Sequence, residues 1–135
     1  MWRVLTHVCR TAAILTSLLG VSCSSPLEPS ASLTETFSGT LTQQGASTHT
    51  FSVVQNGAAR ITLVSLAPFS NVTVGMGAGT VGDGTCILTA SDVRMRPGET
   101  LTAELGAGTS CVVIYDVGDL SGLEPISYSL EVVHT

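Results

Sequence analysis

The sequence predicts an all-β fold, an antiparallel β-sandwich of about eight strands with a jelly-roll-like arrangement, after a cleaved N-terminal signal helix. Three observations support this prediction. Short segments alternate apolar residues with serine or threonine; Gly, Pro, Asn and Asp separate these segments; and no stretch after Val21 has the spacing of an amphipathic helix. A sandwich buries one face of each strand, so the serine and threonine side chains should face water.

Four strands are expected in the first half of the sandwich, at residues 36–41, 48–53, 60–63 and 72–76. The turn dipeptide Asn56-Gly57 follows the second strand, and a loop at Pro68 follows the third. The positions predicted to lie on the apolar face are Phe37, Gly39, Leu41, His49, Phe51, Val53, Ile61, Leu63, Val72, Val74 and Met76.

The other four strands are expected at residues 86–88, 101–105, 111–115 and 126–132. The glycine-rich segment 75–84 precedes the first of them, a Pro97-Gly98 turn the second, and residues 106–108 the third. The predicted apolar-face positions are Cys86, Leu88, Leu101, Ala103, Leu105, Cys111, Val113, Tyr115, Ile126, Tyr128, Leu130 and Val132.

The composition fits one domain and excludes one class of function. The chain has 135 residues and is 44% hydrophobic, but only 11% charged, against roughly 25% in a usual soluble domain. It has ten acidic side chains and five basic ones, all of them arginine, so the net charge is −5. Nucleic-acid binding requires a basic surface that this composition cannot build.

Residues 1–22 are predicted to be a lipoprotein signal peptide. Arg3, His7 and Arg10 form a positive head, and eleven uncharged residues, 11–21, follow. A transmembrane helix needs about 20 apolar residues, whereas a secretory signal needs a shorter core. The alternative, a buried N-terminal core helix, leaves the abrupt polar stop at residues 22–26 unexplained.

The motif Leu19-Gly20-Val21-Ser22-Cys23 resembles the lipobox of bacterial lipoproteins. The resemblance implies that a diacylglyceryl group is attached to Cys23 and that cleavage occurs just before it; Gly20 departs from the usual Leu. The expected location is the bacterial cell envelope, lipid-anchored, with outer-membrane sorting compatible with Ser24. The alternative is ordinary signal cleavage nearby, which leaves a soluble exported protein with a free Cys23.

The cysteine count agrees with this prediction. Cys9 is lost with the signal, and if Cys23 carries lipid, Cys86 and Cys111 remain to form one disulfide in an oxidising compartment. Such a bond cross-links strands, and a link between the two sheets is one possibility. We interpret the pair as structural, with a redox role as the alternative. No CxxC spacing favours a metal site.

Two further parts follow the signal: a flexible tether at residues 23–34 and the sandwich domain at residues 35–135. The tether contains Pro26 and Pro29 among serines and has no strand or helix period. It spans only roughly 20 Å as a random coil, so the domain should lie close to the membrane.

The domain resembles pre-peptidase C-terminal-type domains. Residues 106–116 (GAGTSCVVIYD) and 126–133 (ISYSLEVV) are similar to the family's last two strands, and residues 37–41 (FSGTL) and 49–53 (HTFSV) to its start. The resemblance spans roughly residues 35–133. It implies a β-sandwich that serves as an accessory unit of exported bacterial proteins, often beside a hydrolase. Ser110 stands where Tyr is usual, and the cysteine pair occurs in only some relatives.

Catalytic residues, cofactors and metals are not expected. No hydrolase or nucleotide-binding motif is present. For His49 a structural role is favoured over a general base, and His134 is expected to face solvent. Asp116 and Asp119 are the best candidates for Ca²⁺, but hydrogen bonds within turns are the favoured explanation for both.

Arg94 and Arg96 flank Met95 before a turn. They could dock an anionic group, or they could simply form a solvated strand face.

The predicted function is a non-enzymatic, membrane-anchored binding or structural module whose partner is an unknown envelope protein or glycan. The alternative is a carbohydrate-binding module or an accessory domain assisting an exported hydrolase. Sugar platforms usually need exposed aromatic rings. The chain after its signal has no Trp, and Tyr115 and Tyr128 both fall on predicted apolar faces.

Overall fold

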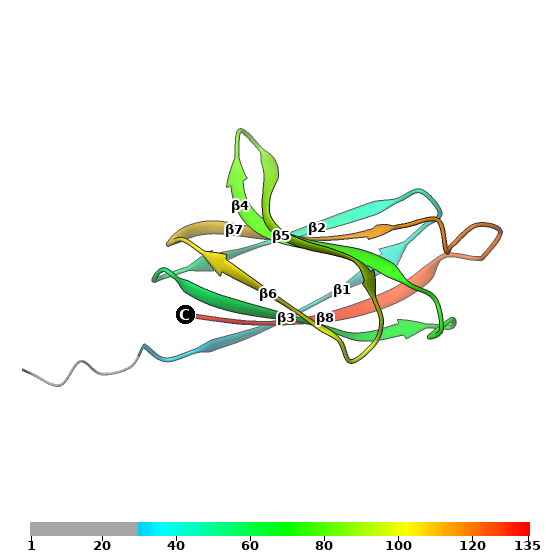
Figure 1. Ribbon diagram of the computed structural model, residues 1–135, viewed down its shortest axis with the longest axis horizontal. Helices are drawn as coiled ribbons and strands as arrows, with labels where there is room; N and C mark the ends of the chain where they lie inside the picture. The colour runs from blue at the N-terminus through cyan, green and yellow to red at the C-terminus, as the bar shows by residue number, and fades with distance from the viewer. Residues whose placement is uncertain (1–29) are drawn as a thin grey trace, which may run out of the picture.

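Two four-stranded antiparallel sheets pack face to face in the computed structural model, which describes residues 30–135. The predicted all-β sandwich is therefore confirmed (Figure 1). The predicted signal peptide, Cys23 and most of the tether lie outside the described residues. The strands are β1 (Leu33–Leu41), β2 (Ala46–Val53), β3 (Gly57–Ala67), β4 (Val74–Gly82), β5 (Thr85–Met95), β6 (Thr100–Leu105), β7 (Gly108–Asp116) and β8 (Ile126–His134).

The order of strands is β1-β8-β3-β6 in one sheet and β2-β7-β4-β5 in the other. The first and last strands of the domain are therefore neighbours, and Phe37 of β1 pairs with Leu130 of β8. β1 begins two residues before the domain boundary expected from the sequence, because Leu33 already pairs with His134.

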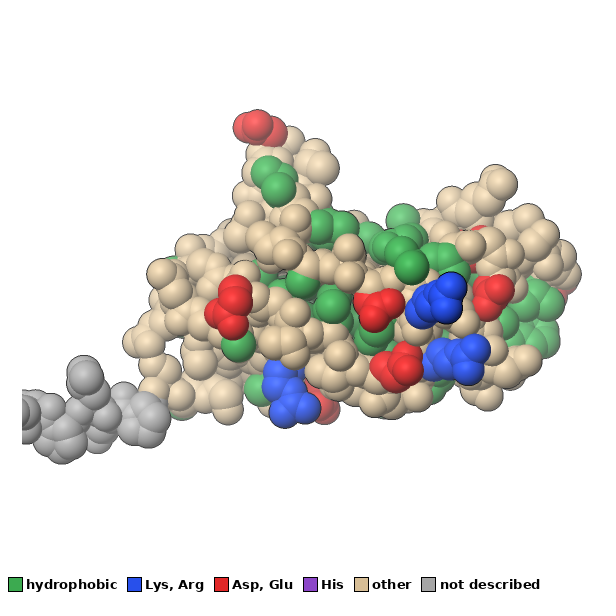
Figure 2. Space-filling model, viewed as in Figure 1, with side chains coloured by type: hydrophobic (Ala, Val, Ile, Leu, Met, Phe, Trp, Pro, Cys, Tyr) green, Lys and Arg blue, Asp and Glu red, His purple; other side chains and the backbone are tan. Residues whose placement is uncertain are grey.

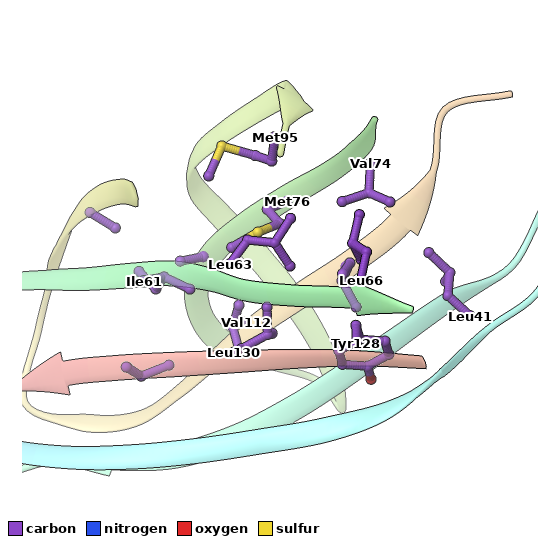
Figure 3. Close-up of a cluster of buried hydrophobic side chains, with 14 of the residues drawn as sticks. Leu41, Ile61, Leu63, Leu66, Val74, Met76, Met95, Val112, Tyr128 and Leu130 are labelled. Atoms are coloured by element: carbon purple, nitrogen blue, oxygen red, sulfur yellow. The ribbon is translucent and has the colours of Figure 1, made fainter. Parts of the chain in front are cut away.

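The core lies between the sheets and consists mainly of aliphatic side chains. Along β8, buried Ile126, Tyr128 and Leu130 alternate with the more exposed Ser127 and Ser129, as the period of a half-buried strand requires. Figure 3 shows side chains from opposite sheets meeting in this layer, among them Leu63, Met76, Val112 and Leu130.

The glycine-rich segment 75–84 does not separate two strands as expected. Residues 75–82 belong to β4, and the turn occupies only residues 83–84. The inward positions of β4 carry Val74, Met76 and Ala78, all fully buried.

The outward positions of β4 are glycines, and side chains of neighbouring strands occupy the space above them. A Cβ atom on Gly75 would lie 2.2 Å from the Tyr115 ring, and one on Gly77 would lie 2.7 Å from the Leu88 side chain. Glycine is required here because another side chain already fills the position that a Cβ would take.

Successive strands run in opposite directions, so their connections lie alternately at the two ends of the sandwich. The connections at residues 68–73, 96–99 and 117–125 lie together at one end, which we call the distal end (Figure 1). The start of β1 and the end of β8 lie at the opposite end.

Candidate functional site

The predicted disulfide is present between Cys86 of β5 and Cys111 of β7, with Cα atoms 5.8 Å apart. It lies within one sheet. Strand β4 runs between the two bonded strands, and its Gly79 pairs with Cys111 while its Val81 pairs with Cys86. The bond therefore cross-links two strands that are not neighbours in the sheet, and it lies next to Gly79, which has no side chain.

The apolar faces predicted for β5 and β7 are wrong. The core-facing residues of β7 are Val112 and Ile114, so Cys111 and Tyr115 point to the outer face of the sheet. On β5, Leu88 is 43% exposed. Val113 also lies on the outer face of β7. Tyr115 is only partly buried, whereas the sequence predicts it in the core.

Asp116 acts as a hydrogen-bond acceptor for two loops. Its Oδ1 accepts bonds from the backbone N–H groups of Gly118 (2.8 Å) and Leu120 (3.2 Å), and its Oδ2 from that of Gln44 (2.9 Å). Burial raises the pKa of Asp116, but the backbone hydrogen bonds outweigh it, and the pKa lies below its ordinary value.

Asp119 has a similar role. Its Oδ2 accepts a hydrogen bond from the backbone N–H of Thr73 at 2.9 Å, which joins the 117–125 loop to the connection before β4. Within residues 30–135, no three His, Cys, Asp or Glu side chains gather closely enough to hold a metal ion. Asp116 bonds the backbone of the turn that follows it, as the turn interpretation expects, whereas the hydrogen bond of Asp119 joins a different loop.

Asp116→Ala is expected to lower the free energy of unfolding by about 1–2 kcal/mol, since three backbone donors lose their acceptor. Urea unfolding at neutral pH measures this loss. Glu124→Ala, an exposed change in the same loop, serves as the control and should leave the midpoint unchanged. Because the folded-state pKa of Asp116 is lowered, its stabilisation is present above 3.8 and is lost as the pH falls through the lower folded value. Equal midpoints for both variants would contradict the role of Asp116.

His49 belongs to a polar chain between the two sheets. Its Nε2 lies 2.7 Å from the Tyr128 hydroxyl, which donates a hydrogen bond to Ser47 Oγ at 2.6 Å. The imidazole also stacks on Phe37, with ring centroids 5.0 Å apart. Burial lowers the pKa of His49. The side chain thus links β2 to β8, which agrees with the structural role favoured for it.

Acidification should expose the contribution of His49. A histidine whose pKa is lowered by folding stabilises the protein fully above its unfolded value of 6.5, and this contribution declines as the pH falls below that value. We expect the urea midpoint to fall between neutral and mildly acidic pH. In His49→Gln, which cannot ionise, this fall should be smaller. The same pH dependence in both proteins would show that His49 does not contribute.

The expectation that His134 faces solvent is wrong, because β8 continues to the penultimate residue. His134 is only 2% exposed, its Nε2 lies 2.8 Å from Glu35 Oε1, and its ring centroid is 5.0 Å from that of Phe51. The imidazole lies on the inward-facing side of β8, like Val132 before it, at the end of the core next to β1.

A groove of about 830 Å³ lies at the distal end. Three separate connections build it, and we call it the distal groove. Its lining residues are Thr73, Val93, Arg94, Arg96, Glu99, Val117 and Asp119. The basic side chains on this part of the surface lie close together, with acidic and hydrophobic side chains around them (Figure 2). A smaller pocket of about 420 Å³, which includes Leu33 and His134, lies at the opposite end.

The sequence indicates Arg94 and Arg96 as a possible anion site, but it contains no sign of the other residues that line the groove. Val117 and Asp119 lie more than twenty residues further along the chain and reach the groove only through the pairing of β7 with β4. The local sequence contains no signal for this meeting.

Comparison with protein-family models gives no match to the chain, and comparison with curated proteins gives none either. Residues 30–135 contain no helix with the length and apolar character needed to cross a membrane.

Proposed function

We propose that the chain is an exported bacterial lipoprotein, anchored in the cell envelope through a lipid on Cys23, whose sandwich domain is a non-enzymatic binding or structural module. The Cys86–Cys111 disulfide carries this proposal, because disulfides persist in oxidising compartments such as the periplasm. With that pair formed and Cys9 inside the proposed signal, Cys23 remains as the residue for lipid attachment.

The bonding of the titratable side chains supports a non-enzymatic role. His49 is bonded to Tyr128, His134 to Glu35, and Asp116 to backbone N–H groups. Each of these groups is engaged in holding strands or loops together, which is a structural use of side chains that elsewhere serve in acid–base catalysis. The resemblance of its motifs to pre-peptidase C-terminal-type domains agrees with an accessory role, and Ser24 is compatible with outer-membrane sorting.

Cys23→Ala is expected to move the protein from the detergent phase to the aqueous phase, because the thiol that receives the diacylglyceryl group is missing. Partition of whole-cell extracts of an expressing bacterium between the two phases measures the change. Cys9→Ala is the matched control and should stay in the detergent phase. If Cys23→Ala also stays there, lipid attachment at Cys23 is rejected.

A carbohydrate-binding module is the second candidate, and one observation favours it. Tyr115 lies on the outer face of the β2-β7-β4-β5 sheet, half-buried against Gly75, where an aromatic ring can reach a ligand. Binding to an insoluble polysaccharide that is lost in Tyr115→Leu would favour this candidate.

A further inference from the structure

The distal groove contains cationic side chains that have no anionic partner within residues 30–135. Residues 30–135 include three arginines, and two of them, Arg94 and Arg96, line this one groove. Among residues 30–135, the ion pair with a nitrogen-to-oxygen distance within 4.0 Å is His134–Glu35. The guanidinium groups of Arg94 and Arg96 therefore lie more than 4.0 Å from every carboxylate of these residues.

The nearby carboxylates are held by backbone donors instead. Glu99 Oε2 accepts the N–H of Arg96 at 2.7 Å, Asp119 Oδ2 accepts that of Thr73 at 2.9 Å, and Asp92 Oδ1 accepts that of Arg94 at 2.8 Å. Nine carboxylates and three arginines give residues 30–135 a net charge of −6. Even in this acidic domain, both guanidinium groups remain available to an acceptor from outside.

The groove also has apolar walls. Val93 is 55% exposed and Val117 is 39% exposed, and both line the groove beside the arginines. A planar guanidinium binds a carboxylate through two parallel hydrogen bonds, and the valines can cover a small apolar group next to it. The combination fits a carboxylate attached to an apolar side chain.

The groove has two carboxylates as well as two guanidinium groups in its lining, so the lining has no net charge. A ligand that places one carboxylate against the arginines and an uncharged remainder beside Glu99 and Asp119 suits this lining better than phosphate, which carries charge on every face. An adjacent amide N–H of the ligand can moreover donate to the free oxygen of Glu99.

We propose that the distal groove binds the carboxyl terminus of a partner polypeptide that ends in a small apolar residue. This inference rests on the proposed binding-module function and names the partner's chemistry. The position of the groove agrees with it. The connections that line the groove lie at the end of the sandwich opposite the start of β1 (Figure 1), so a chain anchored through its N-terminal side presents the groove away from the membrane.

The test is a titration of the isotopically labelled full-length protein, purified in detergent, with acetyl-Ala-Val at millimolar concentration. The backbone amide signals of residues 93–96 and 117–119 should shift and saturate. Acetyl-Ala-Val-amide, which lacks the charge but keeps the apolar side chain, should cause no saturable shift at these positions. Inorganic phosphate should bind more weakly than the free acid.

Arg94→Gln/Arg96→Gln should weaken binding of acetyl-Ala-Val about tenfold or more, because the charged donors are lost. Both side chains are exposed, so the fold should survive, and the unchanged remainder of the spectrum verifies it. Arg60→Gln, the matched control on β3, should bind as the unmodified chain does. Equal binding of the capped peptide, stronger binding of phosphate, or no saturable shift would each overturn the proposal.

The proposal for the groove and the proposal for the lipid anchor can be rejected independently of each other. The titration measures ligand binding at residues 93–96 and 117–119 whether or not the protein carries a lipid. The phase partition measures lipid attachment at Cys23 alone. Acetyl-Ala-Val should therefore bind Cys23→Ala as strongly as it binds the unmodified chain.

Discussion

Gly79→Ala is expected to destabilise the domain by about 3 kcal/mol or more, the upper part of the range for overpacked sites. A Cβ atom on Gly79 would lie 1.8 Å from the carbonyl oxygen of Ile87. This atom belongs to the backbone of β5, so no rotation of a side chain can relieve the contact. Strand β5 has to move away from β4, which disturbs the pairing beside the disulfide.

Chemical unfolding monitored by fluorescence or circular dichroism measures this loss. Gly106→Ala is the control, because its Cβ would meet an atom of Asn56 at 3.8 Å, an ordinary van der Waals distance. That variant should unfold within about 1 kcal/mol of the unmodified domain. A Gly79→Ala protein as stable as Gly106→Ala would show that β5 does not lie against β4 as described.

Removing the disulfide by Cys86→Ala/Cys111→Ala should lower the free energy of unfolding by about 3–4 kcal/mol in the chain-entropy model, since the bond closes a loop across a sequence separation of 25. This is a large part of the roughly 5–15 kcal/mol that stabilises a typical domain. Alanine is the appropriate replacement because Cys111 is fully buried, and a serine hydroxyl there would need a partner.

Comparison of unfolding with and without reductant checks the effect. The unmodified protein should lose stability on reduction, and the double variant should show no response to reductant. A reductant response of equal size in both proteins would mean that another bond is responsible.

The strands and most of the core faces could be predicted from the sequence because alternation is a local property. Ile61 and Leu63 on β3, and Leu130 and Val132 on β8, lie in the core as their spacing indicates. On β7, by contrast, residues 111–115 are all apolar, so the sequence contains no alternation that could distinguish the two faces.

The error on β5 has a different cause. Cys86 and Leu88 lie in a part of β5 that is largely exposed, so alternation there does not mark a core face. Register shifts between β4 and β5 follow further along β5, and Ala90 rather than Leu88 packs against the core. Glycines on β4 permit this arrangement by leaving room above the strand. A glycine-rich segment is more typical of a loop, and only its neighbours in space show that it is a central strand.

The candidate sites show the same limit. Asp116 is followed by Gly118, a local turn signal, and its hydrogen bond to the Gly118 N–H could be anticipated. Its bond to Gln44 joins residues 72 positions apart, and no local pattern indicates it. The distal groove likewise depends on three connections that meet only after both sheets have formed.

The pairing of β1 with β8 also has a kinetic consequence. The first strand finds its partner in its sheet only when the last strand is present, so a chain emerging with its N-terminus first cannot complete that sheet until nearly all of it is free. Contacts between residues this far apart slow folding, because a long loop must close before they form. If the chain passes through a narrow channel with its N-terminus first, as export would require, the sheet of β1, β8, β3 and β6 can close only after the final strand has passed.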